Sequence, residues 1–250
     1  MYLSWNKKTI SDFADENVEK LYSEGFVFTR TGKGDMNQTR SVRIDLGKFI
    51  LNSENRRILS HTKNFELDAA PLPYSDYDWR VHKMGKDFYE KKFGPKIFSA
   101  QKIKEMLTDP AKSNFNLLLI YTPPPATTPK SLVWWPAPPL KGEGNTAGSP
   151  LPLRGRTGEG VLGYCICFET KNILHYSYPF YDLESKQKDL GLGMMQKAIL
   201  HAKVEGKKYV YIGSAQRPAD VYKLQFNGLE WFDGKEWKRN LEELKKILKQ

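Results

Sequence analysis

A long stretch rich in proline and glycine, residues 122–160, limits what this 250-residue chain can fold into. Most of the 15 prolines of the chain lie in it, so no helix or strand can continue through it. Such a composition buries too little apolar surface to offset the entropy of ordering, which predicts a mostly disordered insertion. The apolar runs on either side, residues 115–121 and 161–168, are therefore predicted to be neighbouring strands of one interrupted hairpin.

Beyond this stretch the sequence alternates between strand and helix patterns. Residues 161–168 and 173–180 are apolar runs separated by Asn172, a turn-favouring residue, which predicts consecutive antiparallel strands. A helix with an apolar side is expected at 191–205, ended by Gly206. The elements expected after it are a buried strand at 209–212, a short helix at 219–226, a hairpin around Asp233 and Gly234, and a basic amphipathic helix at 241–248. This alternation predicts a mixed α/β fold.

The residues before the proline-rich stretch predict shorter elements. A helix is expected at 13–24, because Val18, Leu21 and Tyr22 supply an apolar face and Gly25 a stop. The other expected elements are strands at 26–28, 41–46 and 115–121, a loop at 31–40, a helix capped by Asn52 or Ser53, an ordered connector at 69–79, and basic helices at 86–92 and 99–107. They indicate a small N-terminal α/β region ahead of the main sheet.

The net charge of +10 favours a polyanionic partner such as nucleic acid or a phosphorylated cofactor. Four basic residues cluster around the expected loop at 31–40, and they are either a solvated basic edge or contacts to phosphate. These candidate phosphate-contacting residues are Arg30, Lys33, Arg40 and Arg43.

The sequence predicts neither a metal site nor a membrane segment. Cys165 and Cys167 alternate within an apolar run, so both are expected to be buried core thiols. The four histidines are scattered without the spacing of metal ligands. Lys7 and Lys8 are not followed by an apolar signal region, and no run approaches the roughly 18 apolar residues of a membrane helix. We therefore expect a cytoplasmic protein.

A glycine turn, Lys188-Asp189-Leu190-Gly191-Leu192-Gly193, lies between an expected strand and an expected helix. Backbone N–H groups and the helix dipole can hold an anion in this setting, and glycine lets a ligand approach the backbone closely. Taken alone, the turn is weak evidence for a ligand site and more often marks a plain helix start with tolerated glycines.

This region resembles the GNAT superfamily, in which a basic or amide residue, two spacers and Gly-x-Gly open a long helix after the fourth strand. Lys188 stands where that family usually has Arg or Gln. The resemblance implies a GNAT-like mixed sheet with flanking helices. It also implies that the turn binds the pyrophosphate of acetyl-CoA, and that a splayed strand at 209–214 holds the pantetheine arm and the acceptor amine.

A wider resemblance is to the arginyl-tRNA-protein transferase family, the N-end rule aminoacyltransferases. The similar stretches are 24–30, 43–49, 53–59, 178–182, Leu190-Gly191, 208–213 and the pair Tyr222-Lys223. Those enzymes have a GNAT-like catalytic domain that uses aminoacyl-tRNA as co-substrate and no CoA. This chain departs from the family at 35–39, which lacks its cysteines, and at 214–218, which keeps only the proline of a His-Ser-Cys-Pro type segment.

These resemblances divide the chain into four parts. Residues 1–68 resemble the N-terminal domain of the aminoacyltransferases, and 69–121 supply connector helices and the first catalytic strand. Residues 122–160 are the insertion, and 161–250 are the GNAT-like catalytic region.

The function expected from the sequence is transfer of an amino acid, arginine or a similar one, from aminoacyl-tRNA to the N-terminal amine of a protein or peptide. The amine must lose a proton, and its pKa near 8 means that a carboxylate or tyrosine suffices as acceptor. The candidate catalytic residues are Asp182, Asp189, Tyr211 and Tyr222, and the candidate donor-binding residues are Lys188, Gly191, Gly193, Arg217 and Lys223. The alternatives are an N-acetyltransferase that uses acetyl-CoA and a non-catalytic RNA-binding relative.

Overall fold

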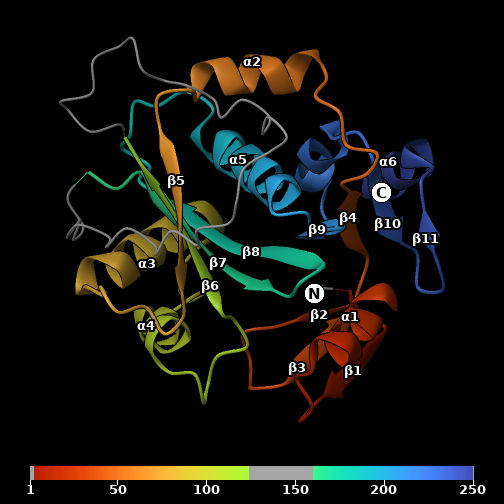
Figure 1. Ribbon diagram of the computed structural model, residues 1–250, viewed down its shortest axis with the longest axis horizontal. Coiled ribbons are helices and arrows are strands. Elements are labelled where there is room, and N and C mark those ends of the chain that lie inside the picture. The colour runs from red at the N-terminus through yellow and green to blue at the C-terminus, as the bar shows by residue number, and fades with distance from the viewer. Residues whose placement is uncertain (1–2, 124–159, 250) are drawn as a thin grey trace, which may run out of the picture.

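The computed structural model describes residues 3–123 and 160–249, which form one large sheet with helices on both faces and a small sheet beside it (Figure 1). The predicted mixed α/β architecture is confirmed. The insertion predicted at 122–160 falls, except at its ends, outside the described residues.

The large sheet has the strand order β11-β10-β4-β9-β8-β7-β6-β5. Its strands are β4 (Ser41–Asp45), β5 (Glu66–Pro71), β6 (Leu117–Thr122), β7 (Gly163–Glu169), β8 (Ile173–Tyr181), β9 (Tyr209–Ser214), β10 (Leu229–Phe232) and β11 (Trp237–Lys238). β8 and β9 pair in parallel, and the other neighbouring strands pair antiparallel. The interrupted hairpin is confirmed, because β6 and β7 pair from Leu117↔Cys167 to Tyr121↔Gly163.

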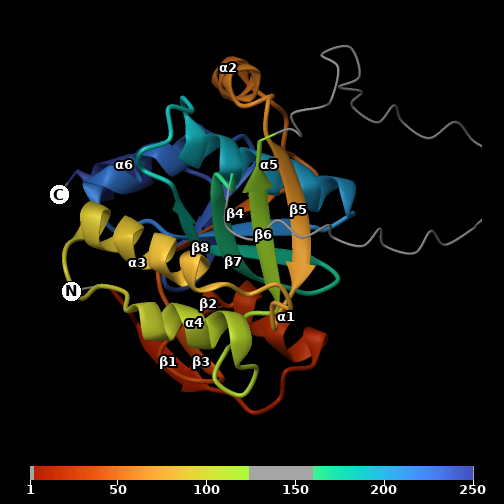
Figure 2. The same cartoon turned by 90° about the vertical axis from the view of Figure 1, so that its left-hand side faces the viewer.

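Both faces of the central strands are buried, which explains why their sequences are continuous apolar runs. Along β6, Leu118 and Ile120 join one hydrophobic cluster and Leu117 and Leu119 the other. The first cluster includes residues of α3 (Trp79–Phe93) and α4 (Ala100–Thr108), and the second residues of α5 (Leu190–Val204) (Figure 2). Each such buried leucine contributes about 1.5–3 kcal/mol to folding.

A further helix, α2 (Ser53–His61), lies outside α5 and runs along it (Figure 1). It begins where the sequence predicts, because the Asn52 side chain accepts a hydrogen bond from the Asn55 backbone N–H. The Gln196 side chain of α5 donates to the Asn55 carbonyl oxygen at 2.9 Å. Gly193 lies near Thr62, just past the end of α2, so the two helices are antiparallel.

Three strands differ from the sequence predictions, at residues 6–9, 35–38 and 66–71. The expected loop at 31–40 contains β3 (Asp35–Gln38), which pairs with β1 (Asn6–Thr9) and β2 (Phe26–Phe28) in the small sheet beside α1 (Asp15–Ser23). The loop prediction is wrong there, because mostly polar residues form this strand, and pairing with a strand on each side, together with the burial of Met36, stabilises it. The connector expected at 69–79 overlaps β5, an edge strand that the sequence prediction missed.

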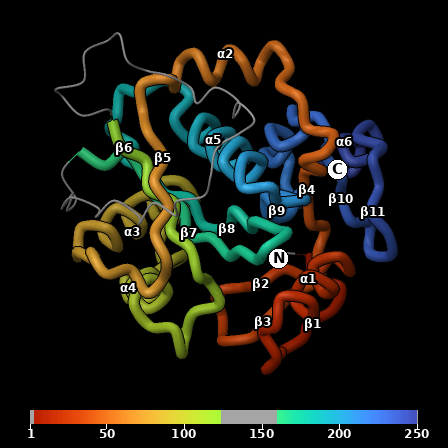
Figure 3. The backbone as a smooth tube through the Cα atoms, viewed as in Figure 1, coloured from red at the N-terminus to blue at the C-terminus, as the bar shows by residue number. Residues whose placement is uncertain are grey.

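The N-terminal residues are built into the large sheet. β4 lies between β9 and β10, so residues 41–45 contact strands near the C-terminus (Figure 3). The boundary proposed at residue 68 falls inside β5. The predicted hairpin of β10 and β11 and the closing helix α6 (Leu241–Leu248) are confirmed, and the short helix η1 (Pro218–Gln225) is a 3-10 helix.

Candidate functional site

The large sheet opens between β8 and β9. These strands pair only from Ile173↔Tyr209 to His175↔Tyr211, after which β8 continues along β7 and β9 along β4. Residues 177–179 and 213–214 are partly exposed there, although both strands lie inside the sheet. We call this opening the β8–β9 crevice. Ligands bind in mixed α/β sheets at such places, outside the carboxyl ends of parallel strands.

The splay that the GNAT resemblance implies for residues 209–214 is therefore present. Its apex is the pair His175↔Tyr211, packed against Tyr22 with a ring-centroid distance of 4.9 Å from Tyr22 to Tyr211. Both apex side chains are buried. Burial raises the pKa of Tyr211, a predicted catalytic residue, to about 12, so its hydroxyl keeps its proton near neutral pH. Its position suits a hydrogen-bond donor better than a base.

His175 is held neutral at the apex. The Tyr22 hydroxyl oxygen accepts the Phe28 backbone N–H at 3.3 Å and lies 2.9 Å from His175 Nδ1. The hydroxyl proton is then free to point at Nδ1, which acts as the acceptor. Burial lowers the pKa of His175 to about 3. The floor of the crevice is thus aromatic with a neutral histidine, and the Arg43 guanidinium donates to the Tyr211 hydroxyl at 3.3 Å.

Two predicted cations lie beside the diverging strands, one next to β8 and one next to the end of β9. The Arg30 guanidinium lies 5.8 Å from the ring centroid of Tyr178 on β8 and donates to the Ile97 carbonyl oxygen at 2.7 Å. On the β9 side, Arg40 donates to the carbonyl oxygen of Ala215 at 3.4 Å, and burial lowers the pKa of Arg40. These contacts hold both positive charges beside the strands that diverge.

The other two residues of the predicted basic cluster have different surroundings. Arg43 is 8% exposed and forms an ion pair with Glu230 at 2.8 Å, while the Trp237 ring centroid lies 3.9 Å from its guanidinium. The Arg43 charge is therefore buried and paired with Glu230. Lys33 donates from Nζ to the Ser113 carbonyl oxygen at 2.6 Å, on the side of the small sheet.

Three more predicted residues gather at the end of β9. Lys223 Nζ donates to the Ser214 carbonyl oxygen at 2.6 Å and lies 3.2 Å from the Asp220 carboxylate. Burial lowers the pKa of Lys223, which the carboxylate opposes. Tyr222 and Arg217 are exposed on either side of Asp220. The carboxyl end of β9 thus carries a fixed ammonium group with more exposed neighbours.

The glycine turn opens α5, as the sequence predicts, and both of its glycines are needed for packing. A Cβ at Gly191 would lie 2.9 Å from the Tyr181 ring, and one at Gly193 would lie 2.4 Å from Thr62 Cγ2. No side chain caps α5, and the Gly193 N–H is bonded to the Asp189 carbonyl oxygen at 2.8 Å. The turn is thus a tight contact between α2, β8 and α5.

A charged cluster, which we call the His61 cluster, covers this turn. It consists of Glu54, Arg57 and His61 of α2 together with Asp189. Asp189 Oδ2 lies 2.7 Å from His61 Nδ1 and 2.9 Å from Arg57 Nη1. The hydrogen bond from His61 lowers the pKa of Asp189, burial opposes this effect, and the hydrogen bond from Arg57 lowers the pKa further. No local pattern points to His61, because 128 positions separate it from Asp189.

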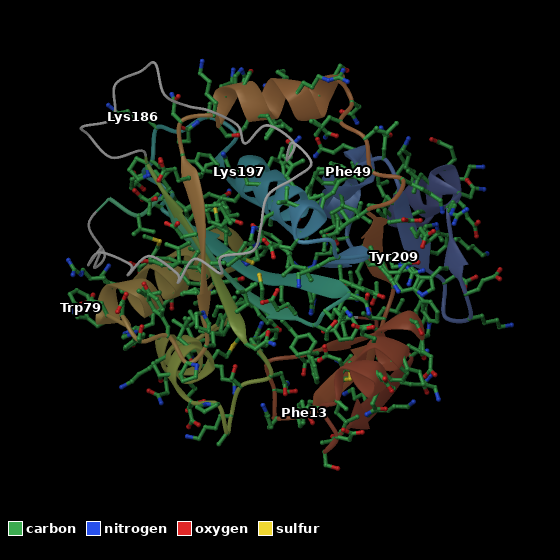
Figure 4. All side chains as sticks on the ribbon, viewed as in Figure 1. Phe13, Phe49, Trp79, Lys186, Lys197 and Tyr209 are labelled. Carbon is green, nitrogen blue, oxygen red and sulfur yellow. The ribbon has the colours of Figure 1, made fainter. Side chains whose placement is uncertain are left out.

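A shallow hollow of about 350 Å³ adjoins the start of α5. It is lined by Lys92, Tyr181, Asp182, Leu183, Ser185, Gln187, Asp189, Leu190, Gly191 and Leu192. The hollow brings together two predicted catalytic residues, Asp182 and Asp189. Lys188 is exposed in the turn between them and does not line the hollow. Figure 4 places the neighbouring Lys186 and the side chain of Phe49 toward opposite ends of α5.

Other predictions concern the core and the membrane. Cys165 and Cys167 are free, buried thiols, as expected. Within residues 3–123 and 160–249, no group of three or more Cys, His, Asp or Glu is arranged to hold a metal ion. No helix in the same part of the chain is both long and apolar enough to cross a membrane.

No family model and no curated protein matches this chain. Among solved structures it is similar to L-PGS from Bacillus licheniformis, with 9% identity, a TM-score of 0.45, and coverage of 94% of this chain and 71% of that one. It is also similar to a C-terminal domain of a lysylphosphatidylglycerol synthetase from Agrobacterium fabrum (12% identity, TM-score 0.41, 83% and 52% covered). A third similar structure is a GCN5-related glucosamine N-acetyltransferase region of a fungal multi-domain β-N-acetylglucosaminidase. Its identity is 7% and its TM-score 0.43, with coverage of 90% of this chain and 22% of that one. Similarity at this level assigns no function, so the function is argued from the site.

Proposed function

We propose that this protein transfers an aminoacyl group from a charged tRNA to the N-terminal amine of a protein or peptide. The observation that carries the proposal is the β8–β9 crevice with a cation fixed beside each of the diverging strands, Arg30 and Arg40. The 3′ end of a charged tRNA is a small ester on a polyanion. It requires a narrow opening for the ester and positive charge at the rim for the phosphates.

The aromatic side chains beside Arg30 also suit a nucleic acid. Arg30 lies over the Phe98 ring at 4.4 Å from its centroid, and Tyr178 is within 5.8 Å of the same guanidinium. Aromatic rings and arginine together bind unpaired nucleotides by stacking and by charge. In this proposal, the ammonium group of Lys223 at the end of β9 offsets the negative charge that develops on the ester carbonyl oxygen during attack.

The start of α5 favours an amine over a pyrophosphate. A helix N-terminus attracts anions, but two carboxylates, Asp182 and Asp189, line the hollow at this end, and Asp189 makes no capping hydrogen bond to α5. A pyrophosphate would meet both, whereas the ammonium group of an acceptor would be attracted by them. This charge distribution supports charged tRNA over acetyl-CoA. The acetyltransferase alternative keeps one observation in its favour, the absence of a capping side chain on α5.

The test uses the purified protein, a panel of tRNAs charged with labelled amino acids, and peptides with free acidic N-termini. We expect label to pass to a peptide, and acetyl-CoA to leave the melting temperature unchanged. The variant Arg30→Ala is expected to weaken tRNA binding and to lower the salt slope by about 1, with the exposed Lys186→Ala as control.

Each alternative has its own signature. Saturable stabilisation by acetyl-CoA would replace this proposal with the acetyltransferase. Salt-dependent tRNA binding without transfer from any donor would identify a non-catalytic RNA-binding relative. The absence of both transfer and tRNA binding would remove the proposal.

A further inference from the structure

We propose that an aromatic and basic surface beside the β8–β9 crevice binds the unpaired 3′ nucleotides of the tRNA. The surface consists of Lys92, Phe93, Lys96 and Ile97, at the end of α3 and in the loop that follows it, and we call it the Phe93 platform. The inference rests on the proposed function and names the part of the donor that this surface holds, the last bases before the ester.

Two large apolar side chains of the platform face solvent. Phe93 is 49% exposed and Ile97 is 44% exposed, on either side of a turn at Gly94, where φ is 100°. The Ile97 carbonyl oxygen accepts a hydrogen bond from the Arg30 guanidinium at 2.7 Å, which fixes this loop to the β8 side of the crevice. An exposed ring offers a stacking surface to a nucleobase, since every base has a π face.

The charge of the platform suits the phosphates that join such bases. The two acidic side chains of α3, Asp87 and Glu90, are each bound to a lysine four positions earlier, at 2.5 and 3.2 Å. Lys92 and Lys96, on either side of Phe93 along the chain, are exposed. A polyanion that approaches Phe93 therefore meets positive charge, whereas the nearby carboxylates of the helix are already paired.

A series of ring contacts joins the platform to the crevice. Phe93 stacks on Tyr89 with the ring centroids 5.7 Å apart, and Tyr89 contacts Phe98 at 4.9 Å. The Arg30 guanidinium lies 4.4 Å from the Phe98 centroid. The Tyr89 hydroxyl also donates to the carbonyl oxygen of Pro179, a residue of β8 in the crevice, at 3.1 Å. The platform and the β8 side of the crevice are therefore parts of one packed surface.

This arrangement identifies which nucleotides fit. Bases inside a duplex stack on one another, so only unpaired bases can stack on a side chain. In a charged tRNA, the unpaired nucleotides next to the ester are those of the 3′ end. Stacked nucleotides advance by about 3.4 Å each, so a base on Phe93 belongs to a nucleotide a few positions before the one that carries the ester in the crevice.

The experiment measures binding of the whole chain to an uncharged tRNA and to the same tRNA trimmed of its unpaired 3′ nucleotides, at several salt concentrations. The variants are Phe93→Ala, Phe93→Tyr and Lys96→Ala. Trp79→Ala is the matched control, because Trp79 is 58% exposed at the other end of α3, about 21 Å along the helix (Figure 4).

We expect Phe93→Ala to weaken binding of the intact tRNA about 5- to 150-fold, the loss of one stacked base, without a change in the salt slope. Phe93→Tyr should keep the affinity, because it keeps an aromatic ring. Lys96→Ala should lower the salt slope by about 0.7, as expected for one phosphate contact on a single strand. The trimmed tRNA should bind the wild type and Phe93→Ala equally, and Trp79→Ala should bind both RNAs as the wild type does.

The outcomes separate this inference from the proposed function. If the wild type neither transfers an amino acid nor binds tRNA, the proposed function fails. If the wild type binds tRNA and a folded Phe93→Ala keeps its affinity for the intact tRNA, only the role of the platform is overturned. An equal loss for intact and trimmed tRNA also overturns it, because the surface would then contact the paired stem.

Two further comparisons complete the test. If Phe93→Ala weakens binding of the acceptor peptide and leaves tRNA binding unchanged, the surface belongs to the acceptor and the inference is overturned. If Phe93→Ala does not fold, Phe93→Leu decides by the same comparison of the two RNAs, because leucine keeps an apolar side chain but has no ring.

Discussion

The buried histidine at the apex of the crevice makes the stability of this protein depend on pH. His175 is 2% exposed, and its Nδ1 accepts the hydroxyl proton of Tyr22. Protonation would turn Nδ1 into a second donor facing that hydroxyl, inside an aromatic cluster that cannot solvate the charge. The perturbation is therefore acidification, compared between the wild type and His175→Gln, in which an amide oxygen replaces the acceptor and nothing titrates.

The magnitude follows from the change in pKa on folding, from 6.5 to about 3. The unfolded chain binds a proton below about pH 6.5, whereas the folded chain does not until about pH 3. The contribution of neutral His175 is thus fully present above pH 6.5 and is lost as the pH falls. At pH 4 the interval is about 2.5 pH units, which at about 1.4 kcal/mol each lowers the free energy of unfolding by about 3 kcal/mol.

The assay is urea unfolding followed by circular dichroism at pH 7, 5 and 4. Carboxylates also titrate in this range, so the informative quantity is the difference between the wild type and the variant in the loss from pH 7 to pH 4. We expect the wild type to lose about 3 kcal/mol more than His175→Gln, and the control His201→Gln to behave as the wild type. An equal loss in the wild type and His175→Gln would refute the reasoning.

Two further predictions concern packing and charge. Gly193→Ala should destabilise the protein by about 1–3 kcal/mol in thermal unfolding, because its Cβ would lie 2.4 Å from Thr62 Cγ2. The loss should shrink when Thr62→Ala is added, and an additive double variant would contradict the contact. Glu230→Gln should cost about 3–5 kcal/mol in urea unfolding, because it leaves Arg43 buried with its charge unmatched. A loss below about 1 kcal/mol would show that the Arg43 charge is solvated, and adding Arg43→Met should recover part of the stability.

Much of the fold could be predicted from local patterns. The hairpin of β6 and β7 is visible in two apolar runs on either side of a stretch that cannot fold regularly, because strands buried on both faces need apolar side chains at every position. The start of α2 is visible in Asn52, because the orphan N–H groups of a helix require a nearby acceptor. The location of the glycine turn at the start of α5 follows from the same kind of local signal.

Other parts could not be predicted from those patterns. β3 and β5 have too few apolar residues to be recognised, and each is a strand because of the partner beside it. The predicted basic cluster also divides in the structure. Arg43 is buried against Glu230 near the C-terminus, whereas Arg30 and Arg40 lie beside the diverging strands. The sequence showed that these arginines lie near one another along the chain, but not which side chains each one contacts in the fold.

The sequence by itself determined the order of the helices and of the apolar strands, the excess of positive charge, and the turn that opens α5. These are local properties, since periodicity and helix starts depend on residues within a few positions of one another. Only the tertiary structure decided that β8 and β9 diverge after His175, that Gly191 and Gly193 make close packing contacts, and that His61 meets Asp189. Those contacts join segments far apart in the chain, so they depend on how whole layers pack and not on any local pattern.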